Sequence, residues 1–165
     1  MSLFVRSAVA GVIVSWAALA GADVSVAGGK LVLPGPVVFE TGSDRLSPAS
    51  DAVLGAVRDY LVAHPDITLV RIEGHVDSDG AAAMGQTLTE KRAMSTARWL
   101  TSKGIDCHRL LPVGFGSTKP IAPNDTPANK AQNRRIDFAP AALRGRAIGG
   151  MPVDGGGTVA GDPCK

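Results

Sequence analysis

Hydrophobic residues recur along the chain with two spacings, and the change between them marks strands and helices. Residues 30–39 are rich in aliphatic side chains, but two internal prolines confine this segment to a sheet edge or divide it. At residues 47–48, serine and proline form a typical helix start, because a capping hydroxyl precedes a residue that needs no backbone donor. This helix ends at residues 64–65, and its apolar stripe is Val53, Val57, Tyr60 and Leu61.

A second helix follows from a different start signal. Thr87 is followed three residues later by Glu90, and this pair matches a capping box. Gly104 suits the end of the helix, since glycine readily adopts the left-handed conformation found there. The side chains that we expect to face the core are Ala93, Thr96, Ala97 and Leu100.

Three further strands complete the pattern, at residues 67–73, 110–115 and 134–138, with a helical turn from Thr126 before the last. The order strand, helix, strand, helix, strand, strand predicts an α+β fold of βαβαβ type. In this two-layer fold both helices pack on one face of a mixed sheet. We expect the domain to span residues 30–140.

The first twenty residues are typical of an export signal. An apolar stretch at residues 8–19 ends in a small-x-small cleavage pattern at residues 18–20. This stretch is shorter than the roughly 20 apolar residues of a membrane helix, so we expect cleavage, with an uncleaved anchor as the alternative. Gly21 stands where a lipid-modified protein would carry cysteine. We therefore predict a signal peptide over residues 1–20, followed by a short linker at 21–29.

Export changes the interpretation of the two cysteines. Cys107 and Cys164 would reach an oxidising compartment, where a pair of thiols usually forms a disulfide. The bridge would fix the glycine-rich tail, residues 141–165, against the domain near the end of the second helix. The alternative is a pair of free thiols.

Composition and motifs exclude several functions. Lys and Arg total 17 against 15 for Asp and Glu, and only 4% of residues are aromatic, so neither a basic face nor a base-stacking surface indicates a nucleic acid partner. The chain has no GxSxG or HExxH motif, and neither cysteine has the surroundings of a nucleophile. We expect no enzyme activity, no catalytic residue and no cofactor.

A metal site is also not expected. Glu73, His75 and Asp77 alternate onto one face of a strand, and the following residues imitate the start of a calcium loop. The last ligand position of such a loop would be Gln86, which cannot supply a bidentate carboxylate. We interpret His75 as a structural histidine that is hydrogen-bonded within the turn.

Asp77 and Arg92 are the residues whose chemistry is most specific. Asp77 follows a strand and Arg92 lies in the first part of the second helix. Strand ends and helix starts on one side of such a fold form the usual ligand crevice. An acid and a base that converge there can bind a zwitterion, because each charge of the ligand finds its opposite.

The chain resembles a known family over residues 31–139. Five segments carry the resemblance, in the order FETGSDRL (39–46), IEGHVDSDG (72–80), LTEKRA (88–93), GFGSTKPIAPN (114–124) and NRRIDF (133–138). These segments are similar to the successive signatures of the OmpA-like C-terminal domain. That resemblance implies non-catalytic, non-covalent binding of peptidoglycan in the cell envelope.

The resemblance also implies roles for individual residues. Asp77 and Arg92 match the residues that hold the ammonium and the carboxylate of diaminopimelate in the peptide stem, and Arg134 matches an arginine at the pocket border. The sequence departs from the family pattern at Val76, which replaces threonine, and at Gly85, which replaces asparagine. Gly42 and Arg45 occupy loop positions where the family often has asparagine. These changes affect affinity and selectivity more than ligand class.

Three functions remain open at this point. The first is a periplasmic or outer-membrane-associated protein that binds diaminopimelate-type peptidoglycan, with an envelope protein as a further partner through the tail. The second is a membrane-anchored tether or stator-like module in which residues 1–20 are retained. The third is an envelope interaction protein with a degenerate wall pocket, which the changes at Val76 and Gly85 suggest.

Overall fold

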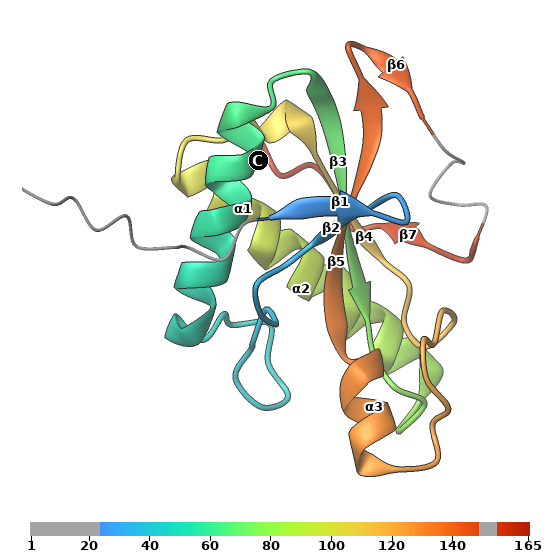
Figure 1. The fold of residues 1–165 in the computed structure, drawn as a ribbon. Coiled ribbons are helices and arrows are strands. Elements are labelled where there is room, and N and C mark those ends of the chain that lie inside the picture. Colours follow the sequence, from blue (N-terminus) through green and yellow to red (C-terminus); the bar gives the residue numbers. More distant parts are fainter. Residues whose placement is uncertain (1–23, 149–154) are drawn as a thin grey trace, which may run out of the picture.

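The computed structural model describes residues 24–148 and 155–165 of the chain. A curled five-stranded sheet forms one layer, and two long helices pack against it (Figure 1). Across the sheet, the strands are β6 (Arg146–Ala147), β5 (Arg135–Leu143), β3 (Ile67–His75), β4 (Leu110–Gly114) and β7 (Thr158–Val159). The central strand β3 runs parallel to β4 and antiparallel to β5. This mixed sheet confirms the predicted α+β fold.

The first long helix, α1, spans Asp51–Ala63 and follows a short 3-10 turn, η1, at Pro48–Ser50. The Ser47 hydroxyl accepts a hydrogen bond from the backbone N–H of Ala49, so the predicted capping residue performs its role. The helix ends before His64, as predicted. Its buried residues are Val53, Leu54, Val57 and Leu61.

The second long helix, α2, spans Ala82–Ser102 and therefore begins earlier than predicted. Thr87 lies inside the helix, where its hydroxyl donates to the backbone oxygen of Ala83. The predicted capping box at Thr87 is wrong, because residues that favour helices precede it and extend the helix backwards. The predicted inward stripe is confirmed, and Thr89 joins it among the buried residues.

A third helix, α3, covers Pro127–Asn133 and brings the chain to the start of β5. The Thr126 hydroxyl accepts from the N–H of Asn129, so the helical turn predicted from Thr126 is confirmed. A 3-10 turn, η2, at Cys107–Arg109 leads into β4. In Figure 1, α3 lies at the same end of the sheet as the C-terminal end of β3.

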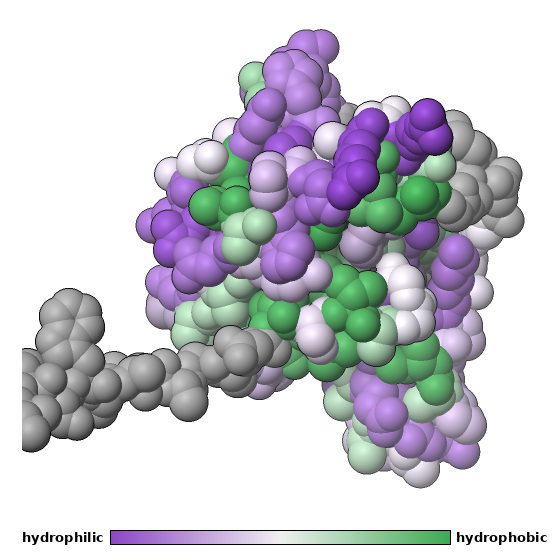
Figure 2. All heavy atoms as spheres, turned by 45° about the horizontal axis from the view of Figure 1, so that its top comes forward, coloured by the Kyte–Doolittle hydropathy of each residue, from purple (hydrophilic) through white to green (hydrophobic). Residues whose placement is uncertain are grey.

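A small antiparallel hairpin was not expected as a unit, although its second strand lies in the segment 30–39, which was predicted to be an edge strand or to be divided by its prolines. It consists of β1 (Ser25–Ala27) and β2 (Lys30–Val32), and it places β1 inside the segment predicted to be a linker. Leu31 is buried, whereas Val26 and Val32 are half exposed. Figure 2 shows a face on which polar residues predominate and apolar patches lie between them. The exposure of Val26 and Val32 shows that the hairpin is only partly covered.

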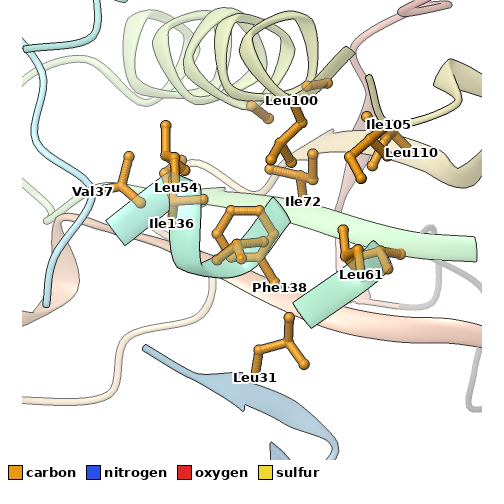
Figure 3. Packing of buried hydrophobic residues seen from close by; sticks show 14 of the residues in the cluster. Leu31, Val37, Leu54, Leu61, Ile72, Leu100, Ile105, Leu110, Ile136 and Phe138 are labelled. Carbon is orange, nitrogen blue, oxygen red and sulfur yellow. The ribbon is translucent and has the colours of Figure 1, made fainter. Parts of the chain in front are cut away.

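The main core lies between the helices and the sheet. Figure 3 shows Leu54 and Leu61 from α1 and Leu100 from α2 around Ile72 of β3 and Phe138 of β5. All five side chains are fully buried. The core therefore fixes both helices on the sheet and holds α2 above the ends of β3 and β4.

The described end of the tail, residues 155–165, lies against the domain. Cys107 and Cys164 form a disulfide, as predicted, with a Cα–Cα distance of 5.3 Å. Just before it, β7 pairs with Val113 and Gly114 of β4, and the N–H of Ala160 donates to the oxygen of Pro112. The tail thus supplies an edge strand of the sheet.

The predicted signal peptide, residues 1–20, lies outside the described residues. Among the helices that the structure describes, none has the length and apolar character needed to cross a membrane.

Candidate functional site

The residues predicted to bind a ligand lie around one cavity, which we name the Asp77 cavity. Its volume is about 760 Å³, and it lies where β3 ends, α2 begins and α3 leads into β5. Asp77, Arg92 and Arg134 all line it, although they are far apart in the sequence. The three residues named as its border also line it, namely Gly42, Val76 and Gly85.

Asp77 is buried and already has partners. One carboxylate oxygen, Oδ1, accepts from the backbone N–H of Asp79 at 2.9 Å, and Oδ2 accepts from Nη1 of Arg134. Burial alone would raise the pKa of Asp77, but the Asp79 amide and Arg134 outweigh it, so the pKa is lowered. Asp77 is therefore negatively charged at neutral pH. Each oxygen can accept more than one hydrogen bond, so the carboxylate can still receive an ammonium group.

Arg92 projects from α2 toward the loop that follows Phe39. Its Nε donates to the backbone oxygen of Ser43 at 2.9 Å, and its guanidinium lies 4.9 Å from the centre of the Phe39 ring. Burial lowers the pKa of Arg92, Asp44 opposes this change and Arg134 adds to it. Within the described residues, its terminal nitrogens make no hydrogen bond. They are free to bind a carboxylate.

Two departures from the family pattern, Val76 and Gly85, both line the Asp77 cavity. A Cβ atom placed on Gly85 would come within 3.1 Å of Cγ2 of Val76. The side chain of Met84, which is 74% exposed, also lines the Asp77 cavity. This wall of the cavity is therefore apolar, and a side chain at position 85 would crowd Val76.

Sequence reasoning missed the residue that fixes the loops beneath the site. Asn133 is fully buried; its Oδ1 accepts from the N–H groups of Ile121 and Ala122. Its Nδ2 donates to Oδ1 of Asn124, which in turn accepts from the N–H of Ser78. A chain of hydrogen bonds thus connects α3 to the turn that carries Asp77. The signal available in the sequence was an asparagine at the start of NRRIDF.

A second cavity, the Phe39 cavity, lies on the other side of the two arginines. It has a volume of about 470 Å³ and shares Gly42, Arg92 and Arg134 with the Asp77 cavity. Phe39, His75 and Arg135 line this second cavity and not the first. Arg92 and Arg134 therefore border both spaces.

His75 is buried on the face of β3 that points away from α2. It is not hydrogen-bonded, contrary to prediction, since both ring nitrogens lack a partner among the described residues. The ring stacks on Phe115, and Nε2 lies 3.7 Å from Glu73 and 3.5 Å from Asp137. The ring is thus held by packing rather than by a hydrogen bond within the turn.

Among the described residues, two groups of side chains have the composition of a metal site. In the first, Glu73, His75 and Asp137 lie close together, but Lys30 contacts both carboxylates, and Arg71 and Arg135 pair with Glu73 and Asp137 respectively. In the second, His108 lies beside Cys107 and Cys164, whose sulfur atoms form the disulfide. The carboxylates of the first group and the sulfur atoms of the second are therefore already engaged, and the ring nitrogens of His75 are the unpartnered atoms of the first group.

Comparisons with known proteins agree with the geometry. The model of the OmpA family matches residues 38–134. The chain is 35% identical over 125 residues to the probable lipoprotein YiaD of Escherichia coli, a match that covers 74% of this chain and 57% of YiaD. It is 37% identical over 107 residues to the peptidoglycan-binding protein ArfA of Mycobacterium tuberculosis, a match that covers 65% of this chain and 32% of ArfA. The chain thus spans about a third to somewhat more than half of these relatives.

The fold matches a crystal structure as well. The peptidoglycan-associated lipoprotein from Burkholderia pseudomallei is 31% identical, with a TM-score of 0.57, and the match covers 62% of this chain and 86% of that one. The matched family segment, residues 38–134, exceeds half of the chain and includes Asp77, Arg92 and Arg134. This chain belongs to the OmpA family.

Proposed function

We propose that the chain binds peptidoglycan non-covalently, by gripping the free amino acid end of diaminopimelate in the stem peptide. The observation that carries the proposal is the balance of charge around the Asp77 cavity. Three carboxylates line it, those of Asp44, Asp77 and Asp79, and three cations face them, Lys91, Arg92 and Arg134. A balanced set of fixed charges favours a zwitterion over a simple anion or cation.

The two ends of the ligand have separate partners in this proposal. The carboxylate binds the free terminal N–H groups of Arg92, where a guanidinium can form two parallel hydrogen bonds. The ammonium binds Asp77, which Arg134 keeps charged and correctly oriented. Lysine in place of diaminopimelate offers only the amine, so it leaves Arg92 without a partner.

The comparisons support the ligand class. ArfA is named a peptidoglycan-binding protein, and the Burkholderia protein is named peptidoglycan-associated. We infer the same ligand here, a location in the periplasm or at the outer membrane, and a binding role without catalysis. An envelope protein that contacts the tail remains a further proposal. The tail offers no thiol for a covalent link, because Cys164 is bonded to Cys107.

The proposal is tested by sedimentation with purified diaminopimelate-type sacculi. Asp77→Ala and Arg92→Ala should each weaken binding about tenfold to a hundredfold, because each removes charge-assisted hydrogen bonds worth about 1.5 to 3 kcal/mol. Arg58→Ala is the matched control, since Arg58 pairs with Asp59 on α1, away from the cavity. Unchanged retention of both site variants would show that this site is not the one that binds.

Selectivity is tested with walls of different chemistry. The parent protein should be retained less by lysine-type sacculi and by sacculi whose diaminopimelate is amidated, because the carboxylate partner of Arg92 is missing from both. Equal retention on all three walls would indicate general adhesion. Failure of the folded protein to bind any wall would favour the interaction protein with a degenerate pocket, for which the apolar cavity wall formed by Val76 and Met84 is the observation.

A further inference from the structure

The two cavities that share Arg92 and Arg134 differ in charge. The Asp77 cavity has three carboxylates and three cations on its walls. The Phe39 cavity has three arginines, Arg92, Arg134 and Arg135, and one carboxylate, that of Glu40. The second space therefore suits an anion that has no ammonium group beside it.

The carboxylate of the Phe39 cavity does not cancel this excess. Glu40 is half exposed and lies 3.6 Å from Arg45, so a cation outside the cavity wall already pairs with it. Arg135 is held in place by Asp137 and by the backbone oxygens of Asn133 and Lys119. Arg135 is thus a fixed part of the wall, and any new ligand bonds come from the other two arginines.

Donors are available on those two arginines. The terminal nitrogens of Arg92 make no hydrogen bond within the described residues, and Arg134 uses only Nη1, toward Asp77. The guanidinium of Arg92 lies over the Phe39 ring, which holds it at the boundary of the two cavities. His75 adds a second sign of an unfilled polar site, because it lines the Phe39 cavity, is 2% exposed and has two unpartnered ring nitrogens.

We propose that the Phe39 cavity is a second subsite, which binds another carboxylate of the same wall peptide while the diaminopimelate end occupies the Asp77 cavity. This inference rests on the proposed function and extends it from one amino acid to a longer part of the stem. A stem tetrapeptide has two carboxylates without an adjacent ammonium, on the α-carbon of glutamate and at the C-terminal D-alanine. Arg92 and Arg134 lie between the two subsites and bind both carboxylates of the ligand.

Isothermal titration calorimetry with small probes tests this subsite. The probes are free meso-diaminopimelate and the tetrapeptide L-alanyl-γ-D-glutamyl-diaminopimelyl-D-alanine. The tetrapeptide is used in three forms: with both of these carboxylates free, with the glutamyl carboxylate amidated, and with the C-terminus amidated. We expect one of the two amidated peptides to bind about tenfold more weakly than the free peptide, as for the loss of one hydrogen bond to a charged group. The amide that weakens binding identifies the carboxylate.

A matched pair of variants assigns the effect to the Phe39 cavity. Thr41 is exposed and lines this cavity but not the Asp77 cavity. Thr41→Glu places a carboxylate beside the arginines, so it should remove most of the difference between the free and amidated peptides. Thr41→Gln has nearly the same size without the charge and should retain that difference.

The outcomes separate the two proposals. If free diaminopimelate does not bind, the proposed function is wrong. If diaminopimelate binds but neither amide weakens the tetrapeptide, the Asp77 cavity is supported and the second subsite is overturned. If one amide weakens binding equally in the parent and in Thr41→Glu, the carboxylate binds elsewhere, and the assignment to the Phe39 cavity is overturned.

Discussion

Glu73 and His75 of β3 are ionisable side chains that are almost fully buried, which is uncommon. Burial would raise the pKa of Glu73, but the nearby His75 ring, Lys30 and Arg71 outweigh it and lower the pKa from 4.5 to about 2. Burial lowers the pKa of His75 below its ordinary value of 6.5, against the opposing effect of Glu73. The folded protein thus holds a charged glutamate and a neutral histidine at neutral pH.

Acid should therefore destabilise the fold in two ranges. Below about pH 6.5, His75 becomes protonated in the unfolded chain while it stays neutral in the folded chain. Below about pH 4.5, Glu73 becomes protonated in the unfolded chain while it stays charged in the folded chain, until the pH approaches 2. Each such proton lowers the free energy of unfolding by at most about 1.4 kcal/mol per pH unit. Urea unfolding at pH 7.5 and 5.5 should show this loss in the parent and a smaller loss in His75→Gln. Equal losses in both would contradict the assignment to His75.

At this scale the sequence predicted the presence of the site residues but not their contacts. Asp77 and Arg92 were identified because each stands in a recognisable segment, and the cavity does contain both. The pairing of Asp77 with Arg134 could not be predicted, since it depends on how α3 delivers the chain into β5. The unpartnered state of His75 likewise depends on the side chains of a neighbouring strand and hairpin.

Helix α2 approaches the sheet very closely, and two glycines make this approach possible. Gly74 of β3 and Gly114 of β4 are neighbours in the strand register. A Cβ on Gly74 would lie 2.4 Å from the backbone oxygen of Thr89, and a Cβ on Gly114 would lie 2.6 Å from the backbone nitrogen of Glu90. The position of α2, and with it that of Arg92, therefore depends on the absence of these two side chains.

Gly74→Ala should destabilise the protein by about 3 kcal/mol, because the added methyl group meets backbone that cannot change rotamer. Gly55→Ala is the matched control, since Gly55 lies inside α1 with open space at its Cβ position. This variant should have a free energy of unfolding about 0.5 to 1 kcal/mol higher than the parent. Thermal or urea unfolding measures both. A neutral Gly74→Ala variant would mean that α2 moves away from the sheet at little cost.

The start of α2 shows why an element boundary can escape sequence reasoning. Its N-cap residue, Ala81, makes no side-chain capping bond. No polar residue therefore marks the true start, while Thr87 and Glu90 imitate a start inside the helix. The interior stripe was predicted correctly because burial against the sheet imposes the helical spacing on it.

At the scale of the whole molecule, short strands from both ends of the described chain join the domain: the β1–β2 hairpin forms a separate small sheet, and β7 extends the five-stranded sheet. The hairpin β1–β2 contacts the core through Leu31, and β7 adds to the edge of β4. β2 lies inside the predicted strand segment 30–39, but its pairing with β1 and the strand β7 were not predicted. Strands of two or three residues show no alternation of their own and gain stability only from the surface they join. The cysteines were the sole signal in the tail, and they gave the correct pairing.

The disulfide should stabilise the fold without taking part in binding. It closes a loop with a sequence separation of 57, and the chain-entropy model assigns about 4 kcal/mol to such a loop. Cys107→Ser with Cys164→Ser should therefore lower the unfolding midpoint and expose the N–H of Ala160 to hydrogen exchange, because β7 is released from β4. Binding to sacculi should persist below the new midpoint, since the bridge lies beyond the C-terminal end of α2 while Arg92 lies in the middle of the helix. The reduced parent is the control and should behave like the double variant. An unchanged midpoint would show that β7 holds the tail by itself, and a loss of binding in the folded variant would show that the tail positions the site.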